Sequence, residues 1–191
     1  MSVYEEGIKL IDEMFGNGKD NLIALATVAR ELSADGKPRP VVRCVDAYYE
    51  DCTFYVVTYA KSNKMLQIEK NAEVSIAFCS EMFTANGTAE NLGWVLDSKN
   101  SGIRTKLRSA FADWYEMANN ENDKDCCILA IHLIRGTLNI NHWEKLYHLD
   151  FVNKTDMESG GIFKSRKQGL EYGSFLLFPF ITEKEGMFIW R

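Results

Sequence analysis

Three side chains in the first half of the chain could together bind a small anion. Ser62 begins a segment with helical character, and Lys64 falls in the first turn of that segment. The first turn of a helix has free backbone N–H groups and the positive end of the helix dipole, so it attracts negative charge. Arg43, on an earlier predicted strand, could add a planar guanidinium that suits phosphate oxygens. These residue types indicate a site for a small phosphorylated molecule.

Thr58 could complete such a site, because it ends the strand that precedes Ser62. Its hydroxyl and the neighbouring backbone groups would suit the polar edge of a planar ring. A simpler interpretation exists, since a serine at a helix start is usually a cap and a lysine in the first turn is usually solvated. Taken alone, the residue types leave both interpretations open.

The histidines and cysteines form no comparable pattern. His132, His142 and His148 are not accompanied by carboxylates at metal-ligand spacing. The five cysteines are Cys44, Cys52, Cys79, Cys126 and Cys127. They include no Cys-x-x-Cys pair, and adjacent residues of a strand point to opposite faces. We therefore expect no metal site and reduced thiols that pack as small hydrophobic groups. The catalytic residues stay unknown.

The elements that must position these residues are predicted to be mostly strands. Helices are expected over residues 3–15, 62–70 and 103–118, where apolar side chains recur at helical spacing. Strands are expected over residues 22–29, 40–47, 53–58, 73–79, 83–90, 126–140 and 143–152, with two more near 175–181 and 187–190. The continuous apolar run at 22–29 predicts burial on both faces. Because most strands follow one another as hairpin-like pairs, the pattern favours an antiparallel barrel with added helices.

Composition favours one globular domain over residues 1–191, with a core at about 20–152 and a C-terminal extension at about 153–191. Of the 191 residues, 46% are hydrophobic and 26% are charged, and the net charge is −5. The acidic balance argues against a nucleic-acid partner. The apolar runs are too short for a membrane span, and the first residues lack the pattern of a secretory signal, so a cytoplasmic location is expected.

Three segments of the chain resemble a known family. Residues 40–46, followed by 54–78 with Thr58-Tyr-Ala-Lys-Ser62-Asn-Lys64 inside them, are similar to the pyridoxamine 5′-phosphate oxidase-like family of FMN-binding split barrels. Residues 83–90 look like the following strand of that family. The resemblance covers residues 20–92 well and 126–150 loosely, and it is closer to the stress-protein and flavin-reductase-like members. It implies a mainly β fold: an antiparallel split barrel with an N-terminal helix and an inserted helix before the last barrel strands.

The resemblance also implies that FMN lies at the interface of a homodimer. By position, Arg43, Ser62 and Lys64 would hold the phosphate, while Asn63 stands where some members have a basic residue. The residues that would surround the ring are Cys44, Val45, Val57, Thr58, Phe83 and Thr84. Trp143 could close the ring from the partner subunit, although a place in the core or in a hairpin is the simpler expectation.

The implied function is that of an FMN-dependent oxidoreductase with an undefined small-molecule substrate and an electron donor such as a reduced nicotinamide. The chain has no Arg-x-His tripeptide of the kind by which true pyridoxamine phosphate oxidases resemble one another, which argues against vitamin B6 oxidation. Two alternatives stay open. One is a protein of the same fold that binds FMN, F420 or haem without turnover, and the other is an interaction protein whose dimer surface is its function.

Overall fold

The computed structural model describes residues 1–78, 80–140 and 145–156. All of these belong to one compact unit, Met1–Glu158. Several predictions lie outside the described residues: the position of Trp143, the strands near 175–181 and 187–190, and most of the extension at 153–191. The single-domain assignment for the whole chain stays a prediction.

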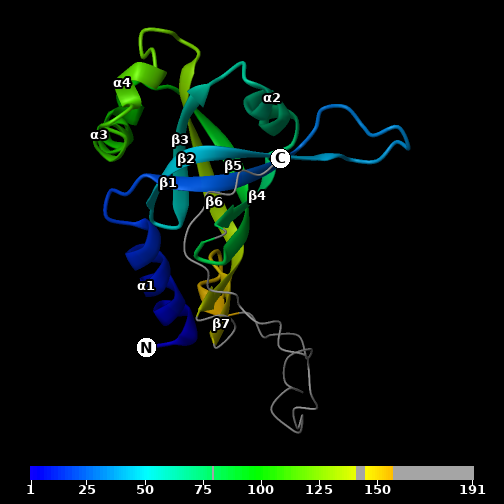
Figure 1. Ribbon diagram of the computed structural model, residues 1–191, viewed down its shortest axis with the longest axis vertical. Coiled ribbons are helices and arrows are strands. Elements are labelled where there is room, and N and C mark those ends of the chain that lie inside the picture. Colours follow the sequence, from blue (N-terminus) through cyan, green and yellow to red (C-terminus); the bar gives the residue numbers. More distant parts are fainter. Residues whose placement is uncertain (79, 141–144, 157–191) are drawn as a thin grey trace, which may run out of the picture. The chain divides into compact units, whose positions relative to one another are not determined.

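The described residues form eight strands and four α-helices (Figure 1). The strands are β1 (Asn21–Val28), β2 (Pro40–Glu50), β3 (Thr53–Tyr59), β4 (Glu73–Phe78), β5 (Phe83–Trp94), β6 (Cys126–Ile140), β7 (Lys145–Asp150) and β8 (Thr155–Asp156). The helices are α1 (Val3–Phe15), α2 (Asn63–Lys70), α3 (Ser101–Ala110) and α4 (Tyr115–Ala118), with a short 3-10 helix at Ser98–Asn100.

Six of the strands close into a barrel. The order is β3-β2-β1-β4-β5-β6, every pairing is antiparallel, and β3 pairs with β6 over seven register positions to close the ring. β7 and β8 continue the sheet beyond β6. The predicted antiparallel barrel is therefore confirmed, together with the N-terminal helix and the helical insert before the last strands (Figure 1).

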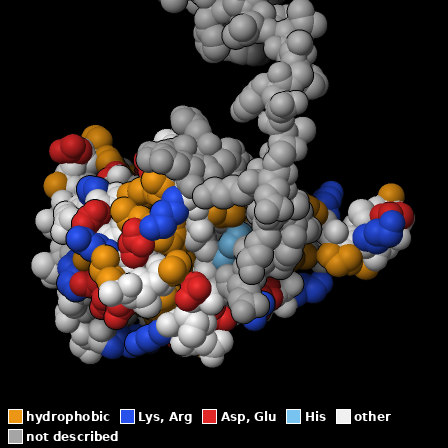
Figure 2. Space-filling model, turned by 90° about the horizontal axis from the view of Figure 1, so that it is seen from below, with side chains coloured by type: hydrophobic (Ala, Val, Ile, Leu, Met, Phe, Trp, Pro, Cys, Tyr) orange, Lys and Arg blue, Asp and Glu red, His pale blue; other side chains and the backbone are white. Residues whose placement is uncertain are grey.

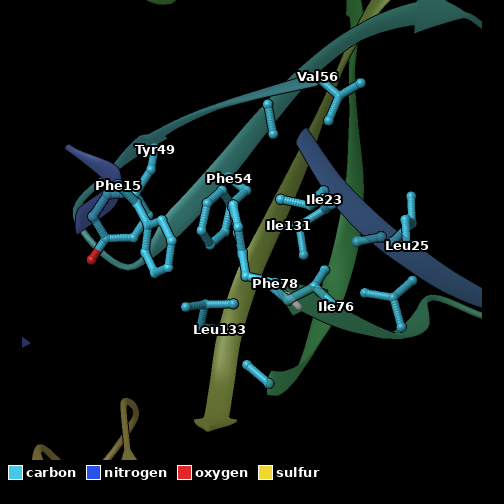
Figure 3. Packing of buried hydrophobic residues seen from close by; sticks show 14 of the residues in the cluster. Phe15, Ile23, Leu25, Tyr49, Phe54, Val56, Ile76, Phe78, Ile131 and Leu133 are labelled. Atoms are coloured by element: carbon cyan, nitrogen blue, oxygen red, sulfur yellow. The ribbon is translucent and has the colours of Figure 1, made fainter. Parts of the chain in front are cut away.

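Aromatic packing fills the end of the barrel near α1. Ser2 and Glu5 form a capping box that fixes the start of this helix, and its apolar stripe ends at Phe15, which is 1% exposed. The Phe15 ring stacks on Phe78 with 4.1 Å between centroids and lies edge-on to Phe54 at 5.9 Å. Figure 3 shows these rings beside aliphatic residues from several barrel strands. Burial of these side chains supplies much of the stabilising free energy of the barrel.

β1 differs from its prediction. Its burial alternates, with Ile23 and Leu25 in the core and Leu22 62% exposed on the other face. Within one copy of the chain, the prediction of burial on both faces was wrong, because nothing in the described structure covers the outward positions Ala24 and Ala26, which are apolar but small. A continuous apolar run therefore does not distinguish a doubly covered strand from one with an apolar outer face.

The predicted helix at 103–118 is also interrupted. α3 ends at Ala110, residues 111–114 form a turn, and α4 begins at Tyr115. The side chains around the break make contacts outside the helix: Trp114 Nε1 donates to Asp20, which is distant in sequence, and the Tyr115 hydroxyl donates to Glu121 in the loop that follows. Tertiary contacts of this kind override local helix propensity.

The described surface carries both signs of charge. On the face drawn in Figure 2, Lys and Arg side chains lie interspersed with Asp and Glu. None of the helices in the described residues is long and apolar enough to cross a membrane. Within the same residues, no group of three or more His, Cys, Asp or Glu side chains is arranged to hold a metal ion.

Candidate functional site

The barrel opens between β2 and β3. These two strands pair at three register positions, from Tyr48–Tyr55 to Glu50–Thr53. Residues 40–47 of β2 instead pair with β1, while all of β3 pairs with β6 on its other side. In the described ladder, the facing edges of residues 44–47 and 56–59 have no partner strand across the gap. Their backbone N–H and C=O groups are free to bind a ligand with a polar edge.

A cavity of about 480 Å³ lies at this opening. Its lining residues are Cys44, Val45, Asp46, Val56, Val57, Thr58, Tyr59, Lys64, Trp114, Ala118, Asn119, Asn120, Asp123 and Cys126. The volume is within the usual range for a cofactor or substrate site, roughly 300–1,000 Å³. The structure thus brings together five of the residues that the sequence singled out: Cys44, Val45, Val57, Thr58 and Lys64.

Lys64 supplies the positive charge of this cavity. Burial lowers the pKa of its ammonium, and the nearby Arg43 guanidinium lowers it further by repulsion. Among the described residues, Lys64 forms no ion pair or hydrogen bond. A half-buried cation beside a second cation is costly unless an anion binds there.

Ser62 lies at the N-cap of α2, as predicted, but its hydroxyl does not cap the helix. The Oγ atom is buried and has no hydrogen-bond partner in the described structure. Such an atom is unusual, because buried polar groups are nearly always satisfied. Ser62 Oγ, Lys64 Nζ and the first N–H groups of α2 therefore form a set of donors suited to an anion.

Arg43 is half-buried and already makes three hydrogen bonds within the chain. It donates to Leu25 O at 3.2 Å, to Thr27 Oγ1 at 2.7 Å and to Gln67 Oε1 at 2.8 Å. Burial lowers its pKa. Its position beside Lys64 agrees with a contribution to the local positive field, but its described bonds join β1 and β2 to α2. Arg43 therefore contributes to the architecture behind the cavity.

The opposite wall of the cavity comes from the insert between β5 and β6. Trp114, Ala118 and the loop at 119–125 lie against the opening. Glu121 holds this loop, because its carboxylate accepts from Arg104 Nε at 2.7 Å, from Arg108 Nη1 at 3.0 Å and from Tyr115 OH at 2.9 Å. The hydrogen bond from Arg104 is the largest effect that lowers the pKa of Glu121 to about 2.

A family model of pyridoxamine 5′-phosphate oxidase matches residues 15–138, which contain nearly all of the six-stranded barrel and every lining residue of the cavity. The chain belongs to the pyridoxamine 5′-phosphate oxidase family. A comparison with curated proteins gave no match.

Solved structures share the family fold at low identity. A haem-binding protein from Mycobacterium smegmatis matches with a TM-score of 0.55 and 14% identity, over 81% of this chain and 60% of that one. A Clostridium acetobutylicum protein described as related to general stress protein 26 matches with a TM-score of 0.50 and 13% identity, over 79% and 96%. A NimC/NimA family protein from the same organism matches with a TM-score of 0.50 and 16% identity, over 77% and 96%. At these identities the likeness shows the fold.

Five residues that the family resemblance implied are not in the lining of the cavity. Two of them are Arg43 and Ser62, described above, and the other three are Phe83, Thr84 and Asn63. Phe83 is 0% exposed in the barrel core, where its ring packs against Phe15. Thr84 lies on the outer face of β5, where it lines a second hollow of about 620 Å³. Asn63 is exposed at the start of α2. Within one copy of the chain, none of these three lines the cavity.

Family resemblance and local pattern both missed several lining residues. Asp46 and Tyr59 lie directly beside residues that had been assigned roles, and their places on the strands could have indicated them. Trp114 falls on the apolar stripe of the helix predicted at 103–118, for which the sequence left open a place in the core or a cap over the cofactor mouth, and the local pattern gave no choice between them. Asn119, Asn120 and Asp123 lie in the polar stretch that follows, and their approach to β2 and β3 is a tertiary contact that no local signal in the sequence reports.

Proposed function

We propose that the chain binds FMN in the cavity between β2 and β3 and acts as an oxidoreductase on a small molecule. The observation that carries the proposal is the unsatisfied donor set at the start of α2. Ser62 Oγ is buried without a partner, and Lys64 is a half-buried cation without a counterion in the described structure. A phosphate would satisfy both groups through charge-assisted hydrogen bonds.

The unpaired edges of β2 and β3 support the rest of the assignment. In the proposed complex, a flat ring with hydrogen-bonding atoms at its edge would lie between backbone groups at 44–46 and 56–58, with Val45 and Val57 as apolar contacts and the Thr58 hydroxyl nearby. When bound, FMN supplies the ability to accept and donate electrons, and the protein supplies binding, orientation and electrostatics. A small-molecule donor would approach from the side of the cavity that the cofactor leaves open.

A homodimer would bring a second set of residues to the cofactor. The hollow that contains Thr84 is lined mostly by small or short side chains of β1, β4, β5 and β6, together with Val42 of β2, which is 63% exposed, and the longer, charged Arg135 of β6. An apolar outer face of a barrel is suited to burial against a second copy. In the proposed dimer, this face lies in the interface and Thr84 reaches the partner's cofactor.

The test is the absorption spectrum of the purified protein, taken again after FMN is added and the excess removed by desalting. Two flavin bands that stay with the protein support the proposal. Bleaching by NADH or NADPH and recovery in air would then support the oxidoreductase over a binding protein. A protein that retains no flavin after this treatment would refute the FMN assignment, and a haem band in its place would identify the alternative cofactor.

A further inference from the structure

The insert wall presents one aromatic ring to the cavity in a fixed orientation. Trp114 lines the cavity, and Phe111 stacks on one face of its indole with 4.7 Å between centroids and an interplanar angle of 21°. The indole Nε1 donates to Asp20 Oδ2 at 2.8 Å. Because these two contacts fix the ring in advance, a planar ligand that packs against it loses less conformational entropy on binding.

The charges that line the cavity divide into two groups. Lys64 is the cation among the lining residues, and the carboxylates are Asp46 and Asp123. Neither carboxylate forms an ion pair within the part of the chain that the structure describes, and the exposed Lys61 pairs with Asp125 instead. Asp123 also raises the pKa of the Tyr59 hydroxyl. Once a phosphate neutralises Lys64, the charges left on the lining are negative.

We propose that the insert wall recognises planar aromatic molecules that carry no negative charge, and that Trp114 contacts their ring. The inference rests on the proposed function, because it takes Lys64 as occupied by the cofactor phosphate. An aromatic ligand gains from offset or edge-on packing against the indole. An anionic group on the same ligand is repelled by Asp46 and Asp123, and a cationic group is attracted. The substrate class is therefore neutral or cationic aromatic compounds.

The experiment compares two probes with the same ring on the FMN-loaded protein. 2-Naphthol is neutral near pH 7 and naphthalene-2-sulfonate is an anion, and calorimetric titration of each measures binding without turnover. We expect 2-naphthol to bind at least about tenfold more tightly. Equal binding, or tighter binding of the sulfonate, would overturn the inference.

Variants of the wall separate the ring contact from the charge effect. Trp114→Ala should weaken 2-naphthol about tenfold, while Trp114→Phe should keep most of the affinity. Met117→Ala is the matched control, since Met117 is on the short helix α4 that follows Trp114, is 83% exposed and does not line the cavity. If Trp114→Ala weakens FMN instead and leaves 2-naphthol unchanged, the wall belongs to the cofactor and the inference is wrong.

The charge effect has its own variant. In the native chain, Asp123 Oδ1 accepts a hydrogen bond from Asp125 N at 2.9 Å. The side-chain oxygen in Asp123→Asn can still accept this hydrogen bond, so we expect the loop to be preserved. Combined with Asp46→Asn, this substitution should raise sulfonate affinity about tenfold and leave 2-naphthol unchanged. No gain for the sulfonate would show that these carboxylates do not select the ligand. Wild-type protein that holds no FMN would refute the proposed function, whereas a failure confined to the naphthalene probes refutes this inference alone.

Discussion

Burying a polar atom without a hydrogen bond costs free energy, and the chain does so at the start of α2. Ser62 Oγ has no partner in the described structure, and Lys64 beside it is a cation whose pKa is lowered by burial and by Arg43. Both groups are satisfied by the same ligand if that ligand carries a phosphate. At the scale of residues, the candidate site is therefore identified by two groups that have no hydrogen-bond partner or counterion in the described structure.

Lys64 should distinguish ligands by their phosphate. Lys64→Ala should weaken FMN binding by about 1.5–3 kcal/mol and leave riboflavin nearly unchanged, because riboflavin has no phosphate. Titration of each flavin by fluorescence quenching measures the two affinities. Lys70→Ala is the control, since Lys70 ends the same helix and donates to Arg30 O. Equal losses for FMN and riboflavin would rule out the phosphate contact.

Ser62 separates a ligand contact from a helix cap. Replacing a capping serine by alanine usually destabilises a protein by about 1 kcal/mol. Because Ser62 Oγ caps nothing, we expect Ser62→Ala to leave the unfolding temperature of the flavin-free protein unchanged or slightly raised, and to weaken FMN binding. Calorimetric unfolding and FMN titration measure the two effects. A fall of about 2–4 °C without loss of FMN affinity would restore the ordinary capping role.

The local sequence located the cavity only in part. Ser62, Lys64 and Thr58 were found because a strand end and a helix start lie within a few residues of each other. The role of Arg43 could not be read in this way, since its bonds to Thr27 and Gln67 depend on how β1, β2 and α2 pack. Residue type indicates what a group can bind, whereas its partners are set by the fold.

At the scale of elements, the insert between β5 and β6 decides what faces the cavity. The apolar stripe at 103–118 predicted a helix, and the structure confirms helical residues at both ends of that range. The break at 111–114 and the inward loop at 119–125 could not be predicted, because both depend on contacts to Asp20 and Glu121. Strands with regular alternation, such as β4, were predicted closely because their burial pattern is local.

Glu121 should make the insert sensitive to acid. Its pKa is lowered to about 2 in the folded chain, so its contribution to stability is present above its ordinary pKa of 4.5 and is lost as the pH falls towards 2. Glu121→Gln should lower the free energy of unfolding by about 2 kcal/mol at pH 7, which is roughly 4–8 °C in the unfolding temperature. The difference in the free energy of unfolding between the variant and the wild type should become smaller below about pH 4.5.

Glu116→Gln is the control for this change. Glu116 pairs with Arg108 on the same insert, but its side chain is 67% exposed, so its loss should cost less than about 1 kcal/mol. Calorimetric unfolding of the three proteins from pH 6 to pH 2 makes the comparison. A difference that stays constant over this range would show that the Glu121 charge is not what holds the loop.

At the scale of the whole molecule, the barrel has two hollowed faces to which we assign proposed roles. One opens between β2 and β3, and the other is the hollow across β1, β4, β5 and β6. The outward alanines of β1, Ala24 and Ala26, make the sequence of this strand continuously apolar, which led to the prediction of burial on both faces. The same two small side chains line the second face. A face built mostly of small side chains over several strands, with Arg135 as the charged residue of its lining, is suited to pack against its own copy.

Ser75 tests the proposed dimer. It is exposed on β4 and lines the hollow, so Ser75→Arg should leave the barrel folded and place a long charged side chain in the proposed interface. We expect sedimentation analysis to show a dimer for the wild type and a monomer for the variant, with lower FMN retention. Ser109→Arg, on the exposed side of α3, should stay dimeric. A wild-type protein that sediments as a monomer at all concentrations would contradict the proposed homodimer.

The three-position seam between β2 and β3 also has a consequence for the kinetics of the backbone. Amides at 44–46 and 56–58 that face the gap have no ladder partner there, so they should exchange with deuterated solvent quickly in the empty protein. A ligand that bonds to both edges would slow this exchange and also raise the energy needed to separate the two strands. Exchange mass spectrometry with and without FMN should show protection concentrated on these two segments. A ligand in the gap would then supply the backbone hydrogen bonds that β2 and β3 do not make to each other over these residues.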